Sequence, residues 1–273
     1  MLGDCFRATE PAPRKSGWIE AIINALAISF VVFAVVFGGA MVGMLLRAIV
    51  PKQHLSDESK AVIQLGIGLV GTMAALVLGL LVASAKSSYD AQSTELTHAS
   101  ANIILLDRLL AHYGPEAKDI RENLRQIVAR IIEQTWSDGR GNPSEFGTKF
   151  SGNEILYEQI QALSPKNDFQ RLLQSQALNI ALNLGQTRWL MFEEGATSVS
   201  KPMLVVMVFW LAIIFVSWGL FAPPNITVVA TLFVVAVSVS GSIFLIMEMY
   251  SPYKGLIQIS SAPLKVALAH LGQ

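Results

Sequence analysis

Four apolar runs dominate this sequence, and each is long enough to cross a membrane as a helix. The runs cover residues 19–46, 62–85, 203–221 and 226–249. A hydrocarbon core of about 30 Å takes roughly 20 helical residues, and lipid offers no hydrogen-bond partner to an unpaired backbone amide. With 52% apolar and only 15% charged residues, the chain is therefore predicted to be an all-α membrane protein with four transmembrane helices.

The basic residues predict how these helices are oriented. Four crossings place both termini and the segment 86–202 on one side of the membrane. That side holds 17 of the 20 Lys and Arg residues, whereas only Arg47, Lys52 and Lys60 lie on the other side. Basic residues near membrane helices favour the cytoplasmic side. We therefore expect a multi-pass protein of the inner (plasma) membrane with both termini in the cytoplasm.

The apolar runs divide the chain into five predicted parts. These are a cytoplasmic N-terminal tail (1–18), a transmembrane hairpin (19–85), a cytoplasmic helical domain (86–202), a second transmembrane hairpin (203–249), and a cytoplasmic C-terminal motif with a short helix (250–273). The first apolar run is longer than a signal-peptide core and no A-x-A site follows it, so we expect it to remain as an anchor.

The segment 86–202 has a helical pattern throughout. Apolar residues recur every three or four positions at Leu96, Ala99, Ile103, Leu106 and Leu110. No glycine or proline occurs from Leu80 to Tyr113. The second membrane helix is therefore predicted to continue unbroken from Val62 to Tyr113, so that its second half stands about 40 Å proud of the membrane.

Further helices are predicted to pack on this extension. They are a helix from Pro115 to Trp136, a short helix from Glu154 to Leu163, and a longer helix capped by Ser164-Pro165. The longer helix has an expected inner face of Phe169, Leu173, Ala177, Ile180 and Leu184. Residues 137–153, with four glycines and one proline, are expected to form a surface loop. Strand-like alternation is absent, which predicts an antiparallel helical bundle.

Small residues form a stripe along the second membrane helix. They are Gly68, Thr72, Ala75, Gly79 and Ala83. One interpretation is close helix packing, with Gly39-x-x-x-Gly43 on the first helix as the matching surface. The other is the wall of a pore around an oligomer axis, where small side chains leave room and expose backbone dipoles. The residue pattern leaves both open.

Residues that carry chemistry are sparse. No nucleotide-binding, hydrolase or H-E-x-x-H metal motif occurs, and the lone Cys5 excludes an intrachain disulfide and a Cys-x-x-Cys site. Four carboxylates suggest a cation site, but they are more typical of side chains that are solvated or paired with residues such as Arg108: Asp90, Glu95, Asp107 and Glu116. We predict no metal, no cofactor and no enzyme activity. A net charge of zero gives no basis for nucleic-acid binding.

Two acidic residues fall within the predicted crossings, Glu20 and Glu248. An ionisable group deep in a membrane is usually functional, whereas one near the interface reaches water. Both residues lie near the expected cytoplasmic ends of their helices. We therefore expect them to reach water, with a proton-relay role as the alternative.

Several ordered motifs resemble a known family. They are S-S-Y-D-A-Q at 87–92, A-N-x-x-L-L-D-R-L-L-A-x-Y-G-P-E-A at 101–117 and S-P-Y-K-G-L-I-Q-I-S-S-A-P-L at 251–264. With Arg121 and Trp136 they are similar to the bestrophin-like family of bacterial and plant membrane proteins, over about residues 62–273. The motif residues that carry the resemblance are Asp90, Asn102, Asp107, Arg108, Tyr113, Gly114, Pro115, Arg121, Pro252, Gly255 and Pro263.

The resemblance implies a relation to bestrophins, which are pentameric, anion-selective channels with four membrane helices and a large cytosolic helical part. An anion and a pentamer are expected from this resemblance and not from residue spacing. The family usually has an acidic residue two places before the motif proline, where this chain has Tyr250. No calcium clasp is therefore assigned.

The sequence predicts a homo-oligomeric ion channel, anion-selective by resemblance, whose pore is lined by the second membrane helix. Its expected partners are copies of itself, the lipid bilayer and inorganic ions. The alternative is a membrane-anchored scaffold or sensor whose cytoplasmic bundle binds a partner. After Pro252 and Gly255 break the fourth helix, a short helix from Pro263 is expected to pack as a foot on the bundle or the membrane surface, with a gating latch as the alternative.

Overall fold

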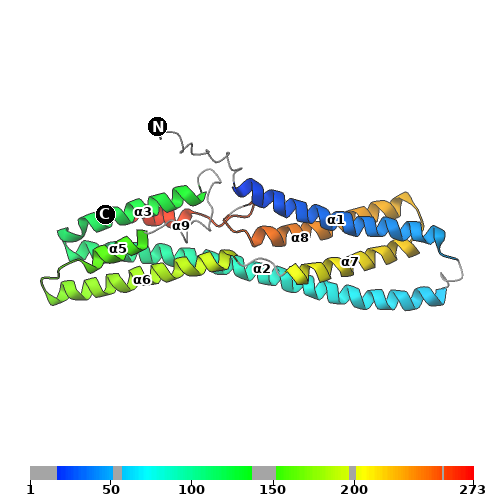
Figure 1. Ribbon diagram of the computed structural model, residues 1–273, viewed down its shortest axis with the longest axis horizontal. Helices are drawn as coiled ribbons and strands as arrows, with labels where there is room; N and C mark the ends of the chain where they lie inside the picture. The colour runs from blue at the N-terminus through cyan, green and yellow to red at the C-terminus, as the bar shows by residue number, and fades with distance from the viewer. Residues whose placement is uncertain (1–16, 52–56, 137–151, 197–200, 254) are drawn as a thin grey trace, which may run out of the picture.

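The protein is elongated, with two helical bundles arranged end to end and one helix that runs through both (Figure 1). The computed structural model describes residues 17–51, 57–136, 152–196, 201–253 and 255–273. Regular structure in these ranges is entirely helical: α1 (Gly17–Ile49), α2 (Asp57–Tyr113), the short 3₁₀ turn η2 (Pro115–Ala117), α3 (Lys118–Trp136), α5 (Gly152–Gln161), α6 (Asp168–Ala196), α7 (Lys201–Phe221), α8 (Ile226–Met249) and α9 (Ala262–His270). The predicted all-α class is confirmed over these ranges.

The membrane bundle consists of α1, residues 57–85 of α2, α7 and α8. All four helices are long and apolar enough to cross a membrane, as the sequence predicted. Their shared core contains Val36, Ala40, Met207, Phe215 and Ala236, each at most 1% exposed. At the end of this bundle away from the second bundle (Figure 1), the Arg47 guanidinium donates hydrogen bonds to the carbonyl oxygens of Phe221 and Ala222. These bonds join α1 to the turn between α7 and α8.

Helices α1 and α7 cross at backbone contact. A Cβ atom at Gly43 would lie 2.0 Å from the carbonyl oxygen of Val216, and one at Gly219 would lie 2.0 Å from that of Ala40. Only glycine fits at such a crossing, since any side chain pushes the backbones apart. The Gly39-x-x-x-Gly43 surface therefore packs on α7, and the prediction that it matches the small-residue stripe of α2 is wrong.

Helix α2 is 57 residues long and unbroken, or about 85 Å at 1.5 Å per residue. It begins at Asp57, five residues before the predicted start, and ends at Tyr113 as predicted. Its first half packs on α7 and α8, and its second half packs on α3, α6 and α9. The prediction of a continuous helix is confirmed, and α2 is the one described helix that belongs to both bundles (Figure 1).

The distal bundle consists of residues 86–113 of α2 together with η2, α3, α5, α6 and α9. Its core includes the predicted apolar face of α2, with Leu96, Ile103, Leu106 and Leu110 buried. Helix α3 contributes Ile120 and Leu124 to this core, and the predicted inner face of α6 contributes Leu173 and Ala177. Leu264 and Ala267 of α9, together with Leu271 directly after it, complete this core, so α9 forms a foot on the distal bundle.

Two details of α6 differ from the prediction. Phe169 was expected to face inward, but it is 60% exposed. It lies in the first turn of α6, where Gln170 and not Phe169 contacts the turn from α2 to α3. The helix is capped by Asn167, whose Oδ1 accepts a hydrogen bond from the Gln170 amide at 2.7 Å, and not by Ser164-Pro165.

The predicted loop at 137–153 lies outside the described residues up to 151, and α5 begins at Gly152.

Candidate functional site

The small-residue stripe of α2 faces away from the other helices of its own chain. Gly68, Thr72, Ala75, Gly79 and Ala83 are all exposed. A Cβ atom added at Gly68 or Gly79 would meet nothing within 4 Å. In the most apolar 18-residue stretch of each membrane helix, 11% of the residues of α2 are buried, compared with 28% for each of α1, α7 and α8. The structure thus shows no intrachain packing role for the stripe, and α2 is the least covered membrane helix.

A groove and a ridge flank this stripe on its two sides. The groove, about 650 Å³, lies between α2 and α7 and is bordered by Gly68, Ala75 and Leu211. The ridge consists of Leu69, Leu76 and Leu80, which are more than half exposed and lie about 100° around the helix from the preceding stripe residues. One face of α2 therefore combines a concave edge, a strip of small side chains and a convex apolar edge.

Beyond the apolar run, the same face of α2 becomes charged. Lys86 lies three residues after Ala83, and its ammonium group forms an ion pair with Asp90 one turn further on. Both side chains are more than half exposed. The Lys86 ammonium also lies 5.6 Å from the centre of the Tyr89 ring. A cation and an anion are thus placed where the small-residue stripe ends.

Asp107 and Arg121 form a buried ion pair between α2 and α3. The Arg121 Nε and Nη2 atoms donate to the two carboxylate oxygens at 2.7 and 2.9 Å, and Asp107 is 1% exposed. The hydrogen bonds that Arg121 donates to Asp107 raise the pKa of Arg121, so the guanidinium stays charged. Asp107 is therefore paired with a basic residue, as one interpretation of the sequence predicted, but the partner is Arg121 and not Arg108, because consecutive residues of a helix do not face each other.

The residues after α9 dock on this ion pair. The Gly272 amide donates to the Asp107 carboxylate at 3.4 Å. The main-chain oxygen of Gln273 accepts from Arg121 at 3.1 Å and from Arg108 at 3.3 Å. Asp107, Arg108 and Arg121, which lie within 14 positions of one another, therefore bind residues that follow them by more than 150 positions.

The motif Tyr113-Gly114-Pro115 makes the turn from α2 to α3. Gly114 has φ = +131°, a backbone conformation that strongly favours glycine. Pro115 then starts the 3₁₀ turn that leads into α3. The Tyr113 carbonyl accepts a hydrogen bond from Gln170 Nε2 at 2.8 Å, which ties this turn to the start of α6. These motif residues have a local structural role.

The C-terminal motif closes around Glu248 at the end of α8. Glu248 is 2% exposed, and its carboxylate accepts a hydrogen bond from the Leu256 amide at 2.5 Å. Gly255 has φ = +114°, and a Cβ atom there would lie 2.3 Å from the carboxylate. The expectation that Glu248 reaches water is wrong, because the chain turns back over it. Pro252 supports this turn, since its carbonyl accepts from the Ile259 amide at 2.8 Å.

The same segment contacts both bundles. The Tyr250 hydroxyl lies within hydrogen-bond distance of Ser84 Oγ, at 3.1 Å, next to the end of the α2 stripe. Trp136 Nε1 donates to the Ile259 carbonyl at 2.9 Å, and its ring meets the Tyr253 ring edge-on at 6.0 Å. The C-terminal motif therefore connects the end of α8 to α2 and α3. Whether it also acts as a gating latch stays a prediction.

Sequence reasoning missed the glutamines that join the distal helices. Gln174 Nε2 donates to the carbonyl oxygens of Ile160 and Leu163, at 2.9 and 2.8 Å, and so caps the C-terminal end of α5. No spacing rule identifies such a residue. Of the remaining motif residues, Asn102 is half-buried and Pro263 lies in the first turn of α9. The structure thus brings the motif residues together as turns, caps and docking contacts, and not as a single cleft.

Among the described residues, no group of three or more His, Cys, Asp or Glu side chains is placed to hold a metal ion. Asp90 and Glu116, two of the four carboxylates considered as a cation site, instead form ion pairs with Lys86 and Lys166. The absence of a metal site in the whole chain stays a prediction.

Comparison with known proteins agrees with the motifs. Neither a curated protein nor a solved structure matches the chain. The sequence profile of one family, described as the bestrophin-like domain, matches residues 30–264. The match begins earlier than the resemblance predicted, within α1, and extends into α9. Because it covers most of the 273 residues, the chain belongs to the bestrophin-like family.

Proposed function

We propose that this protein is a homo-oligomeric ion channel whose pore is lined by the first half of α2. The observation that carries the proposal is the exposed stripe of small residues on the least covered membrane helix. The family points in the same direction, to a channel rather than an enzyme. Copies arranged with α2 toward a common axis would line a water path with small side chains, which leave width for an ion and expose backbone dipoles.

The edges of the stripe support a ring of copies. The ridge of Leu69, Leu76 and Leu80 on one side and the groove beside Leu211 on the other are different surfaces. A head-to-tail interface joins two different surfaces and closes into a ring when the rotation fits. In such a ring the ridge of one copy lies against the groove of the next, and the stripe between them faces the axis.

Anion selectivity and a pentamer are the finer parts of this proposal. Both are favoured by the family relation. Lys86, placed where the stripe ends, supports an anion, since a ring of lysine side chains at a pore mouth attracts anions. The Asp90 carboxylate, which is paired with Lys86, partly cancels the positive potential of this lysine ring. We place the distal bundle in the cytoplasm, on the basis of the charge distribution along the sequence.

The first test enlarges one stripe residue. Ala75→Phe places a large apolar ring in the proposed pore, so chloride flux into proteoliposomes should fall while the oligomer keeps its elution volume. The matched control is Ala230→Phe, which changes an alanine that is also exposed, but on α8. This control should change neither flux nor assembly. If Ala75→Phe instead breaks the oligomer, the stripe packs between copies and does not line a pore.

The second test measures access to water along α2. In a Cys5→Ser background, cysteines at Thr72 and Gly79 should react with a charged, membrane-impermeant thiol reagent, and reaction should reduce the flux. A cysteine at Leu76, on the ridge, should stay unreactive in the assembled protein. Equal reactivity at the three positions would argue that the stripe and the ridge share one environment.

A second candidate function, a membrane-anchored scaffold or sensor, is favoured by the surface of α6. Phe169, Leu172, Trp189 and Leu190 are all more than half exposed on this helix of the distal bundle. Phe169 and Leu172 lie at the start of α6 and Trp189 and Leu190 near its end, so a partner that lies along this helix would meet exposed apolar side chains at both places. Wild-type vesicles that pass neither anions nor cations at varied voltage, pH and calcium concentration would decide for this alternative.

A further inference from the structure

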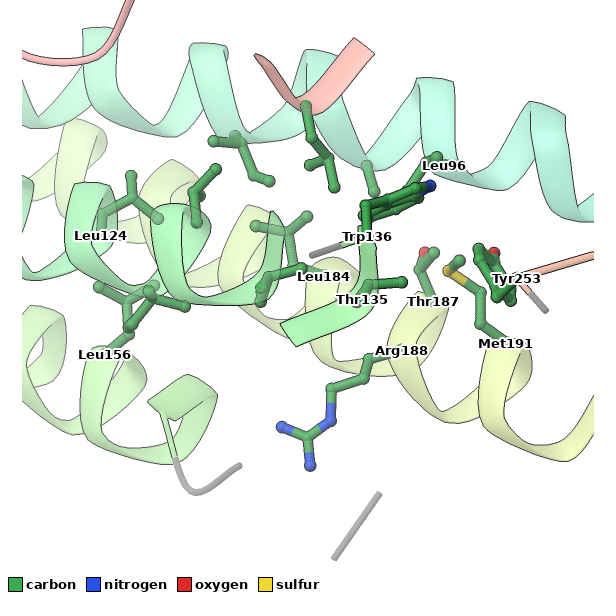
Figure 2. A pocket seen from close by; sticks show the side chains of 16 residues that line it. Leu96, Leu124, Thr135, Trp136, Leu156, Leu184, Thr187, Arg188, Met191 and Tyr253 are labelled. Atoms are coloured by element: carbon green, nitrogen blue, oxygen red, sulfur yellow. The ribbon is translucent and has the colours of Figure 1, made fainter. Parts of the chain in front are cut away.

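A partly enclosed apolar cavity lies inside the distal bundle, away from the proposed pore. Its volume is about 120 Å³, and residues from α2, α3, α5, α6 and α9 line it together with Tyr253 of the C-terminal motif. Figure 2 shows Leu96 of α2, Leu124 of α3, Leu156 of α5 and Leu184 of α6 around this space. With Leu264 of α9, aliphatic side chains therefore come from five helices that meet there.

The rings of Trp136 and Tyr253 lie at one end of the cavity, beside Met191 (Figure 2). Trp136 has its indole N–H occupied, because it donates to the Ile259 carbonyl. Its ring is part of the cavity lining. An aromatic ligand gains from such a position, since ring pairs and sulfur–ring contacts are both attractive.

One polar atom in the lining lacks a partner. Thr135 is 7% exposed, and its Oγ1 atom has no hydrogen-bond partner among the described residues. A buried hydroxyl without a partner costs about 1–3 kcal/mol in desolvation, which a ligand with one hydrogen-bonding group can recover. The structure therefore offers an apolar space with one unsatisfied polar position.

Charge is nearly absent from the lining. Arg188 is the one charged residue among the described residues that border the cavity. In Figure 2 its side chain runs away from Leu96 and Trp136, with the guanidinium farthest from them. Its burial lowers the pKa of the guanidinium, and nearby Glu154 opposes this shift. A charged ligand would thus lose its hydration without a counter-ion inside the cavity.

We infer that this cavity binds a small, uncharged aromatic molecule with one hydrogen-bonding group, such as a phenol, whose ring lies among the apolar side chains and whose polar group bonds Thr135 Oγ1. The size agrees, since an engineered apolar cavity of about 150 Å³ stays dry and binds benzene. This inference goes beyond the proposed channel and does not depend on it, because binding is measured without ion flux.

The test uses 4-fluorophenol and fluorobenzene as probes. Fluorine NMR of the full-length protein in lipid nanodiscs, with empty nanodiscs subtracted, should show saturable binding of both probes. Ala99→Leu fills the cavity from α2 and should abolish the saturable part. Ala101→Leu is the matched control, because Ala101 lies two residues further along the same helix, is exposed, and does not line the cavity. It should bind like the wild type.

Thr135→Val tests the hydrogen bond, since it keeps the side-chain shape and removes the hydroxyl. It should weaken 4-fluorophenol about 3- to 10-fold, the effect of one hydrogen bond, and leave fluorobenzene unchanged. Thr187→Leu fills the cavity from α6 and replaces Ala99→Leu as the blocking variant if the latter fails to fold.

Three results would overturn the inference. The first is no saturable binding of either probe to the wild type, and the second is equal binding to the wild type and the filled variants. The third is tighter binding of 4-fluorobenzoate than of 4-fluorophenol, which would assign the cavity to an anion. An equal effect of Thr135→Val on both probes would show that Thr135 is not the polar contact, and would overturn that part.

Discussion

The buried ion pair of Asp107 and Arg121 allows a quantitative test of what holds the distal bundle together. Asp107 lies at 1% exposure and receives two hydrogen bonds from Arg121 and one from the Gly272 amide. Arg121 is less buried, with 20% of its side chain exposed. Removing Arg121 therefore leaves a buried negative charge, whereas removing Asp107 leaves a positive charge that is partly exposed to water.

Arg121→Ala leaves a buried carboxylate whose closest remaining donor is the Gly272 amide at 3.4 Å. Breaking a buried pair in this way costs about 3–5 kcal/mol. Asp107→Ala leaves a guanidinium that reaches water and keeps its bond to Gln273, so the loss should be smaller, about 1.5–3 kcal/mol. In the double variant no charge is stranded, and its loss should be smaller than the sum of the two single losses, with a coupling of about 2 kcal/mol.

Thermal unfolding of the purified protein, followed by tryptophan fluorescence, measures these differences. A loss of 3–5 kcal/mol corresponds to a decrease of roughly 6–20 °C for a unit of this size. A parallel cycle on Glu116 and Lys166, an exposed pair between η2 and the start of α6, should show almost no coupling because water screens it. Equal single losses at Asp107 and Arg121 that simply add in the double variant would refute the reasoning.

Three further predictions follow from the described contacts. Gly43→Ala should destabilise the protein by about 1–3 kcal/mol because its Cβ meets the α7 backbone, whereas Gly38→Ala on the same helix, with nothing within 4 Å, should be neutral in the same unfolding assay. Ser93→Pro should cost about 3 kcal/mol or more by removing an amide donor from the interior of α2, and an unchanged unfolding temperature would contradict the continuous helix. Lys166 lowers the pKa of Glu116, and Glu116 raises the pKa of Lys166. The stabilisation from this pair should therefore be present between pH 4.5 and 10.5. It should fade as the pH falls through the lowered pKa of Glu116 or rises through the raised pKa of Lys166. The unfolding temperatures of the wild type and Lys166→Met should differ only slightly between pH 4.5 and 10.5, because the pair is exposed, and should converge below the lowered pKa of Glu116 and above the raised pKa of Lys166.

The fold of α2 could be predicted because its determinants are local. The absence of glycine and proline from Leu80 to Tyr113 predicts a continuous helix, and the regular apolar spacing identifies its inner face. Leu96, Leu106 and Leu110 are buried as that spacing requires. The start of α6 was harder to predict, because both Ser164 and Asn167 have a side chain that can cap a helix, and the choice depends on the packing of α5 against α6.

The contacts within the candidate site could not be predicted from the sequence, since they join distant positions. The partner of Asp107 is 14 residues away and the segment docked on both is more than 150 residues away. The burial of Glu248 also depends on a chain reversal, which the sequence signals only through Pro252 and Gly255. The glycines of α1 correctly predicted a close-packing surface on that helix, but not the helix that packs on it. Small residues permit close approach to any helix with a complementary small residue, and here that residue is Gly219 of α7.

The length of α2 has a mechanical consequence for any ring of copies. A straight rod of about 85 Å that pivots near its middle moves its two ends in opposite directions, each by about 4 Å for a tilt of 5°. If α2 faces the axis along its whole length, a tilt that widens the membrane end narrows the distal end. Opening both ends at once requires α2 to bend or to move outward as a whole, and the Tyr250–Ser84 contact lies close to that pivot.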